Sequence, residues 1–219
     1  ASDLYSHLGI RVEFINIGGG IGIPYRLSDN EFNILRLAQE SSELFKKFGS
    51  VYGFTPKLFM ESGRYVTGPH GVLVNRIINV YEKYRRFVGV EVAMPGLMRV
   101  GMYGANGYHH NYILSPEGVL RIDDIVEQSI VGPICENCVR LGDNVQMPLA
   151  FEGDLAVTCD TGAHGTAMTF NYNGRTRVQE LLLLTSGRIV RITKAETYDD
   201  LIVRDVVHPS AGDILEYKV

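Results

Sequence analysis

Two segments that could bind or convert a ligand stand directly after short apolar runs typical of buried strands. Gly18, Gly19 and Gly20 follow the run 12–17, and bare backbone amides at such a place can hold a phosphate group. The segment 61–64, Glu-Ser-Gly-Arg, follows the run 57–60, and strand ends of this kind carry the chemistry in parallel barrels. The dinucleotide pattern GxGxxG is not met, because Ile23 occupies its third glycine position. An ordinary turn and a surface ion pair are the alternatives for these two segments.

A CxxC pattern formed by Cys135 and Cys138 is a third candidate. A zinc site needs a second ligand pair at similar spacing, and a redox pair needs a thioredoxin-like βαβ context. The sequence offers neither, so on spacing alone we expect two partly buried thiols and no metal site.

Arg99 stands among the apolar residues of the segment 98–103. An arginine in such a place is either a buried cation satisfied by the protein or a clamp for a carboxylate, which its planar fork can bind with two parallel hydrogen bonds. The neighbouring His109 and His110 hint at a metal, but adjacent histidines point in different directions on regular structure. We therefore favour a structural role for them.

The elements that must position these residues differ along the chain. Residues 1–66 alternate strand and helix, the pattern of a parallel sheet, with strands expected at 12–17 and 57–60. A capping box of Ser28 and Glu31 predicts the start of the intervening helix. Its predicted end is marked by Lys46, Lys47 and Gly49. Two strands and one helix cannot close a parallel barrel, so another segment must complete this unit.

From about Gly68 the pattern is mostly β. Several short strands separated by glycine-bearing turns indicate a β-barrel or a sandwich. The strands expected from hydrophobic runs are 72–78, 87–92, 155–159, 178–184 and 188–192.

Composition limits the class of protein. The chain has 219 residues, of which 45% are hydrophobic and 21% charged, with a net charge of −4. This balance is ordinary for a globular protein and predicts neither nucleic-acid nor membrane binding. No long apolar run or apolar leader is present, and three cysteines do not make a disulfide scaffold, so the expected location is the cytoplasm. The first residue, Ala1, and the abrupt start predict a fragment of a longer protein.

Taken in order, these motifs resemble those of the alanine-racemase-like (fold type III) pyridoxal-phosphate decarboxylases, and among them the C-terminal half of the diaminopimelate decarboxylase family. The resemblance runs over essentially the whole chain. It is carried by the segments 15–25 (INIGGGIGIPY), 61–64 (ESGR), 97–104 (LMRVGMYG), 132–136 (GPICE), 160–165 (DTGAHG), 171–173 (NYN) and 178–181 (VQEL).

The resemblance implies a fold of the α+β, mainly β class. Residues 1–66 would be the last strands of a pyridoxal-phosphate-binding (β/α)₈ barrel, and residues 67–219 a Greek-key-like C-terminal β-barrel domain. The family's Schiff-base lysine lies in the half of the barrel that this chain does not span. The chain alone is therefore expected to be inactive.

The resemblance also implies a role for individual residues. The residues expected to bind pyridoxal 5′-phosphate are Gly18, Gly19, Gly20, Glu61, Gly63, Arg64 and Tyr172, with Glu61 keeping the pyridinium nitrogen protonated. The residues expected to bind substrate are Arg64, Arg99, Tyr103, Glu136 and Tyr172. Cys135 would donate the proton to Cα after carbon dioxide leaves. The Cys-Glu loop would enter the site of a partner subunit, which implies a homodimer.

The reaction implied is decarboxylation of meso-2,6-diaminopimelate to L-lysine, a step of lysine biosynthesis. The end of this substrate remote from the leaving carboxylate carries an ammonium and a carboxylate, which Glu136 and Arg99 would bind. Ornithine decarboxylases resemble the chain too, but they have Cys-Asp in place of Cys-Glu, and their substrate lacks the distal carboxylate. Carboxynorspermidine, ornithine and arginine remain alternative substrates. A non-catalytic dimerisation module derived from such an enzyme is the alternative of another class.

Overall fold

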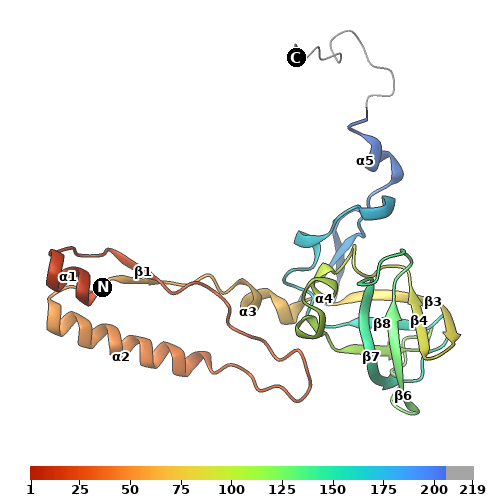
Figure 1. Cartoon of the computed structure of the whole chain (residues 1–219), viewed down its shortest axis with the longest axis horizontal. Helices are drawn as coiled ribbons and strands as arrows, with labels where there is room; N and C mark the ends of the chain where they lie inside the picture. Colours follow the sequence, from red (N-terminus) through yellow and green to blue (C-terminus); the bar gives the residue numbers. More distant parts are fainter. Residues whose placement is uncertain (206–219) are drawn as a thin grey trace, which may run out of the picture.

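The computed structural model describes residues 1–205. An elongated N-terminal unit, a β-barrel and a projecting C-terminal arm follow one another along the chain (Figure 1). The part of the predicted second domain at 206–219 lies outside the described residues. Within the described range, no helix combines the length and apolarity needed to cross a membrane.

The N-terminal unit contains the two predicted strands. They are β1 (Phe14–Asn16) and β2 (Lys57–Phe59), which pair in parallel with Ile15 opposite Leu58. Two helices, α1 (Ser2–Leu8) and α2 (Ile34–Tyr52), lie beside them and join through a cluster of aromatic side chains. The rings in this cluster are those of Tyr5, Phe48, Tyr52 and Phe54.

Both predicted ends of the long helix were wrong. The helix begins at Ile34, where the Asn33 side chain accepts a hydrogen bond from the Arg36 amide (2.9 Å), and not at the Ser28–Glu31 box. Asparagine is as good a cap as serine, and here it stands directly before the apolar periodicity. The helix runs through Gly49 to Tyr52 and is closed by Gly53, whose φ of 72° suits a glycine C-cap.

Helix α3 (Gly63–Thr67) and the 3₁₀ turn η1 (Gly68–His70) connect this unit to the barrel. The predicted domain boundary between residues 66 and 67 falls in α3 and remains a prediction. Backbone contacts hold the connection: the Thr161 amide donates to Gly71 O (2.9 Å) and the Gly162 amide to Gly68 O (3.1 Å). A Cβ on Gly162 would collide with the Thr67 carbonyl, so the chains can approach this closely only because glycine stands there.

The barrel is a six-stranded mixed sheet in the order β5-β8-β3-β4-β6-β7 (Figure 1). All neighbours pair antiparallel except β4 and β6, which are parallel with Phe87 opposite Ser129. The two outer strands approach each other, since Asn111 on β5 donates to Leu141 O on β7 (3.4 Å), and the barrel is nearly closed. The bounds of the strands are β3 Leu73–Glu82, β4 Arg86–Val90, β5 Asn111–Leu114, β6 Ile125–Val131, β7 Arg140–Pro148 and β8 Leu155–Thr158. Strands β3, β4 and β8 were predicted, whereas β5, β6 and β7 were not.

Helix α4 (Met98–Tyr103) and the turn η2 (Gly104–Gly107) lie against the barrel and share its core. Ile77, Val88, Leu97, Ile113 and Ile130 are completely buried there. This apolar cluster is what fixes α4, and therefore its polar side chains, relative to the sheet.

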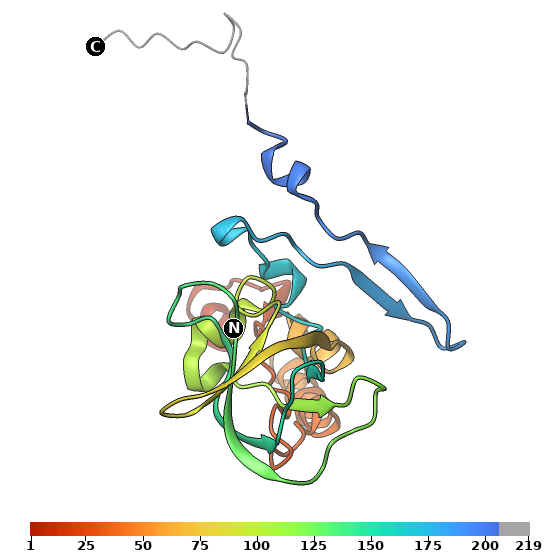
Figure 2. The same cartoon turned by 90° about the vertical axis from the view of Figure 1, so that its right-hand side faces the viewer.

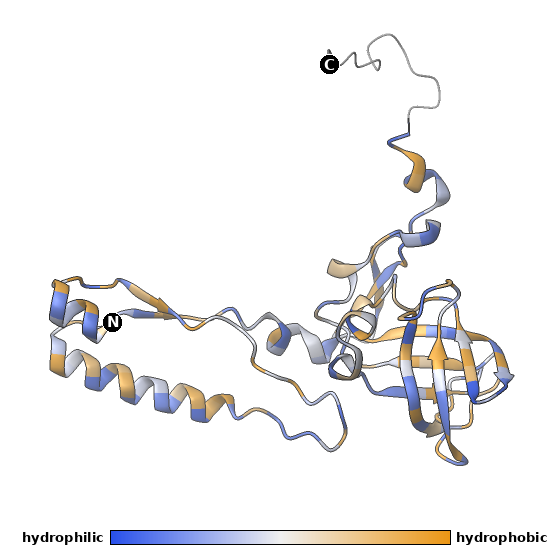
Figure 3. Ribbon diagram, viewed as in Figure 1, coloured by the Kyte–Doolittle hydropathy of each residue, from blue (hydrophilic) through white to orange (hydrophobic). Residues whose placement is uncertain are grey.

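The C-terminal arm holds the remaining predicted strands, β9 (Glu180–Leu183) and β10 (Ile189–Thr193), as an antiparallel hairpin. Short turns η3 (Thr166–Met168) and η4 (Tyr172–Gly174) precede it, and α5 (Tyr198–Ile202) follows it. The hairpin lies outside the barrel (Figure 2), and most residues of its strands are hydrophobic and exposed. Hydrophobic and hydrophilic residues alternate along the exposed helix α2 of the N-terminal unit (Figure 3).

The core position of Leu97 leads to a stability prediction. Leu97→Ala removes a side chain that is 0% exposed, and we expect it to lower the free energy of unfolding by about 2–5 kcal/mol, because a cavity remains. The matched control Leu183→Ala, at a residue that is 68% exposed, should change it by less than about 0.5 kcal/mol. Urea unfolding followed by circular dichroism measures both, and equal effects would contradict the assignment of Leu97 to the core.

Candidate active site

The glycine loop after β1 and the glutamate after β2 are held together by one side chain, Asn16. Its Nδ2 donates to Glu61 Oε1 (2.7 Å), and its Oδ1 accepts from the Gly18 amide (2.8 Å). The pairing of the strands continues past their ends, since the Glu61 amide donates to Gly18 O (2.8 Å). A Cβ on Gly19 would collide with the Glu61 carbonyl, so this close approach requires glycine. The two predicted segments therefore form one site.

The loop has the form of an anion-binding turn. Gly18 and Gly20 have φ values of 71° and 91°, and an added Cβ at either would meet no atom within 4 Å. No oxygen of residues 1–205 accepts a hydrogen bond from the amides of Gly19 and Gly20. Successive free amides in such a turn form a concavity that suits a phosphate.

Arg64, on α3, leaves a donor without a partner. Its Nε is buried, and nothing in the described part of the chain accepts from it. The Tyr25 hydroxyl and the Ser62 hydroxyl are buried and unpaired in the same way. Buried polar atoms are nearly always satisfied, so each of these three atoms is a candidate partner for a bound polar group.

Arg99 lies on α4 and is only 5% exposed. Its guanidinium donates to the carbonyls of Asn106 (3.1 Å) and Tyr108 (3.3 Å) and meets His109 Nε2 at 3.1 Å. It also lies over the Tyr25 ring, 3.9 Å from the centroid. Burial lowers the pKa of Arg99, the neighbouring Tyr25 opposes this effect, and the positive charge of Arg64 lowers the pKa further. The protein thus satisfies much of this buried cation, and its role as a carboxylate clamp remains a prediction.

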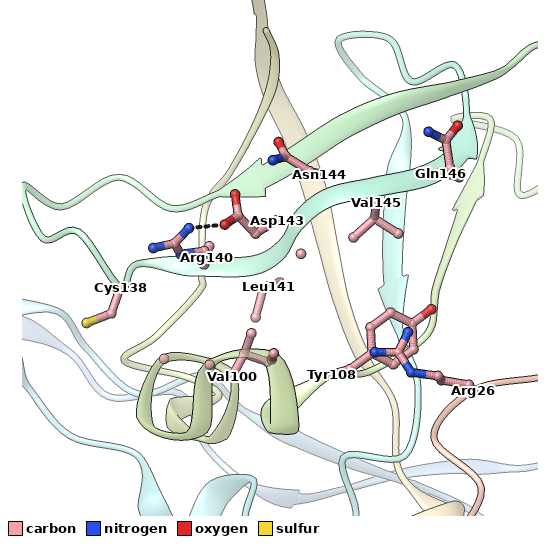
Figure 4. Close-up of a pocket in the computed structure, with 14 residues that line it drawn as sticks. Arg26, Val100, Tyr108, Cys138, Arg140, Leu141, Asp143, Asn144, Val145 and Gln146 are labelled. Carbon is pink, nitrogen blue, oxygen red and sulfur yellow. Dashed lines mark hydrogen bonds and ion pairs between the residues drawn. The ribbon is translucent and has the colours of Figure 1, made fainter. Parts of the chain in front are cut away.

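The two faces of α4 have different surroundings. Arg99 and Tyr103 are four residues apart and share one face, and Tyr103 is half exposed. On another face, Val100 and Gly101, together with Gly104 of η2, line a cavity of about 630 Å³ that lies between α4 and β7 (Figure 4). Arg26 stacks on Tyr108 at the rim of this cavity. None of the residues predicted for catalysis or binding lines it.

The Cys-Glu segment forms the loop between β6 and β7. Cys135 is exposed and Cys138 is half-buried, so the prediction of two partly buried thiols was wrong for Cys135. Cys138 Sγ is 3.0 Å from Met94 Sδ, whereas Cys135 Sγ is 3.9 Å from Asn173 Nδ2. The Glu136 carboxylate accepts from the Asn137 amide (2.9 Å).

The predicted residues therefore fall into two groups. One, the strand-end group, consists of Gly18, Gly19, Gly20, Glu61, Gly63, Arg64, Arg99 and Tyr103. Arg99 and Tyr103 of α4 belong to it through Tyr25, which follows the glycine loop and lies against Arg99. The other, the loop group, consists of Cys135, Glu136 and Tyr172 and is tied together through Asn173. Within residues 1–205, no hydrogen bond or ion pair joins a member of one group to a member of the other.

Comparison with known proteins identifies the family. The pyridoxal binding domain of pyridoxal-dependent decarboxylases matches residues 2–68. The C-terminal sheet domain of the same decarboxylases matches residues 49–162. The chain belongs to the pyridoxal-dependent decarboxylases. Pyridoxal phosphate is the cofactor of this family, as the resemblance implied.

Within this family, the chain is similar to several diaminopimelate decarboxylases. Protein TabA of Pseudomonas amygdali pv. tabaci is 46% identical over 196 residues, which cover 88% of this chain and 44% of that protein. The diaminopimelate decarboxylase of Methanothermobacter thermautotrophicus is 34% identical over 204 residues, which cover 92% of this chain and 46% of that protein. A crystal structure of the diaminopimelate decarboxylase from M. jannaschii in co-complex with L-lysine matches with a TM-score of 0.83 and 30% identity. The match covers 94% of this chain and 45% of that chain. The fold prediction is thereby confirmed, and the chain spans about half the length of the curated relatives it matches.

The strand-end group of this chain fits pyridoxal phosphate. The free amides of Gly19 and Gly20 suit the phosphate, and the Glu61 carboxylate, aimed by Asn16, suits a protonated ring nitrogen. The unpaired Nε of Arg64 suits an anionic group of cofactor or substrate. These assignments remain predictions for the individual residues.

Three residues without an assigned role take part in the site. Asn16 joins the two strand ends, and Tyr25 and His109 pack around Arg99. Asn16 could have been found, because it is the polar residue that ends β1 immediately before the glycine loop. No sequence signal relates Tyr25 and His109 to Arg99, since only the folded barrel brings them together.

Proposed function

We propose that this chain, together with a lysine-bearing half of the barrel, decarboxylates meso-2,6-diaminopimelate to L-lysine. The supporting observation is an excess of positive charge at the strand-end group. No carboxylate of residues 1–205 forms an ion pair with Arg64 or Arg99, and Arg64 Nε is buried without an acceptor. Unpaired buried cations are costly, so an anionic ligand is the natural partner. Diaminopimelate keeps a carboxylate at its unreactive end, which ornithine does not have.

When bound, pyridoxal phosphate supplies the electron sink for the electron pair that departing carbon dioxide leaves behind. The protein's part is to hold the cofactor and to polarise its ring. Gly18, Gly19 and Gly20 hold the phosphate, Glu61 faces the ring nitrogen, and Gly63 leaves room beside the ring. Arg64 and Tyr172 contact cofactor and substrate together.

The remaining residues act on the substrate. Arg99 and Tyr103 bind the carboxylate that is kept, and Glu136 binds the distal ammonium. The bond from Cα to the other carboxylate breaks, carbon dioxide leaves, and the thiol of Cys135 gives its proton to Cα. A thiol is suited to this step because it is a small, weak acid that can be placed against carbon.

We further propose a homodimer in which the loop group of one copy completes the strand-end group of the other. The absence of any hydrogen bond between the two groups within the described residues supports it. Cys135 also stands on an exposed loop between β6 and β7, from which it can reach a second copy.

The need for another part of the barrel is supported by the N-terminal unit itself. Phe14 and Phe59 on the parallel strands are 56% and 49% exposed. Side chains of parallel strands are ordinarily buried on both faces, and a pair of strands has two free edges. The half of a (β/α)₈ barrel that precedes these strands in the relatives would cover both.

The test is carbon dioxide release from meso-diaminopimelate by the product of the complete gene, with added pyridoxal phosphate. We expect one L-lysine for each carbon dioxide, and no comparable release from ornithine, arginine or carboxynorspermidine. If one of these three compounds were turned over faster than diaminopimelate, that compound would become the proposed substrate. Cofactor binding without any release would favour a non-catalytic module.

A further inference from the structure

His109 is completely buried beside Arg99, and its hydrogen bonds fix where its proton lies. Nδ1 is 2.7 Å from the carbonyl oxygen of Cys159. A carbonyl can only accept, so Nδ1 carries the hydrogen and donates it. Nε2 then has a free lone pair, and this lone pair faces Arg99 Nη1 at 3.1 Å.

The surroundings of His109 keep the ring neutral. Burial lowers its pKa to about 4, with a further lowering by the charge of Arg99 and an opposing contribution from the Cys159 carbonyl. The Tyr25 ring packs against the imidazole with its centroid 4.9 Å away. A protonated ring would direct a second donor at the Arg99 guanidinium, which has no lone pair to offer.

Arg99 is therefore held by three neutral acceptors, namely two carbonyl oxygens and one imidazole nitrogen. The Tyr25 ring on its face fixes the plane of the guanidinium. A carboxylate in the place of His109 would also fix the guanidinium, but it would neutralise the charge. Neutral acceptors orient the cation and leave its charge available to a ligand.

The turn η2 contributes to the same arrangement. Asn106 offers one of the two carbonyls, and a Cβ on Gly107 would come within 2.5 Å of Arg99 O. The turn can thus pack against the backbone of α4, with the Asn106 carbonyl beside the guanidinium, only because glycine follows Asn106.

We propose that His109 is a positioning residue, whose neutral imidazole holds Arg99 as an oriented, unneutralised cation for the carboxylate that the substrate keeps. This rests on the proposed function, in which that carboxylate becomes the carboxylate of L-lysine. His109 itself does not touch the substrate. It determines selectivity for substrates with a distal carboxylate by acting through Arg99.

The test compares two competitive inhibitors of the complete gene product, L-lysine and cadaverine, which differ only in this carboxylate. In His109→Leu we expect the inhibition constant of L-lysine to rise by about tenfold or more, while that of cadaverine changes less than about threefold. His109→Gln, which can still offer an acceptor, should recover part of the loss. The matched control His110→Leu should leave the ratio of the two constants unchanged. Equal weakening of both inhibitors by His109→Leu would overturn the positioning role.

A second measurement needs no activity. Nitrogen-15 NMR of the histidine-labelled complete gene product, with the His109 signals identified by their absence in His109→Leu, should show that His109 carries its hydrogen on Nδ1 and stays neutral from pH 8 down to about pH 5. A His109 that carries its hydrogen on Nε2, or that is protonated at pH 7, would overturn the inference and leave the decarboxylase proposal standing. Failure of the unsubstituted protein to release carbon dioxide would instead remove the decarboxylase proposal.

Discussion

Cys135→Ala is expected to lower the turnover of meso-diaminopimelate by about 100-fold or more, because a positioned acid contributes about 10²–10⁴ to a proton transfer. The affinity for pyridoxal phosphate should stay within about twofold, since Cys135 has no part in the phosphate loop. Stopped-flow or steady-state carbon dioxide release measures turnover, and titration followed by absorbance measures cofactor affinity.

Cys138→Ala provides the matched control, because it removes the other thiol of the same loop. The Cys138 thiol contacts Met94 in the barrel core, so it does not have the ligand-facing role proposed for Cys135. We expect turnover within about threefold of the unsubstituted protein. Undiminished activity of Cys135→Ala would show that another group protonates Cα.

Glu61→Gln is expected to have an effect of similar size, a fall in turnover of about 100-fold, with little change in the inhibition constant of L-lysine. The substitution keeps the shape of the side chain, and the Gln oxygen can still accept from Asn16 Nδ2, as Glu61 does at 2.7 Å. It removes the negative charge that would keep the ring nitrogen protonated and the electron sink strong.

The control for Glu61 is Glu40→Gln, which removes one negative charge from an exposed pair with Arg36 on α2. It should change neither turnover nor cofactor binding. If Glu61→Gln retained full turnover, the charge at this position would have no part in the reaction, and a structural role in joining the two strand ends would remain.

Much of the fold could be predicted from hydrophobic runs in the sequence, and the strands that were missed have identifiable causes. Strands β3, β4 and β8 alternate or run apolar as buried strands do. Strand β6 does not, because Gln128 and Ser129 are buried polar residues within it. Gln128 is satisfied there by Arg86, Ala150 and Pro148, which are distant in sequence. A pattern of polar and apolar letters cannot reveal that such a residue faces inward.

In the candidate site too, local features could be predicted from the sequence, whereas contacts between distant residues could not. Strand ends rich in glycine and charge could be recognised locally, as could the loop with Cys135 and Glu136. The pairing of Asn16 with Glu61 spans 45 positions, and that of Cys159 with His109 spans 50. These contacts depend on which strands become neighbours, and the sequence does not state that directly.

The glycine contacts at the end of α3 have a consequence for protein engineering. Gly68 and Gly71 meet Gly162 backbone to backbone, so Arg64 is held in place by a segment nearly 100 positions further along the chain. A chimaera that takes its pyridoxal-binding part from one relative and its sheet domain from another would cut through this contact. Its parents would have to share the residues around 67–71 and 161–165, even where the rest of each part is exchanged freely.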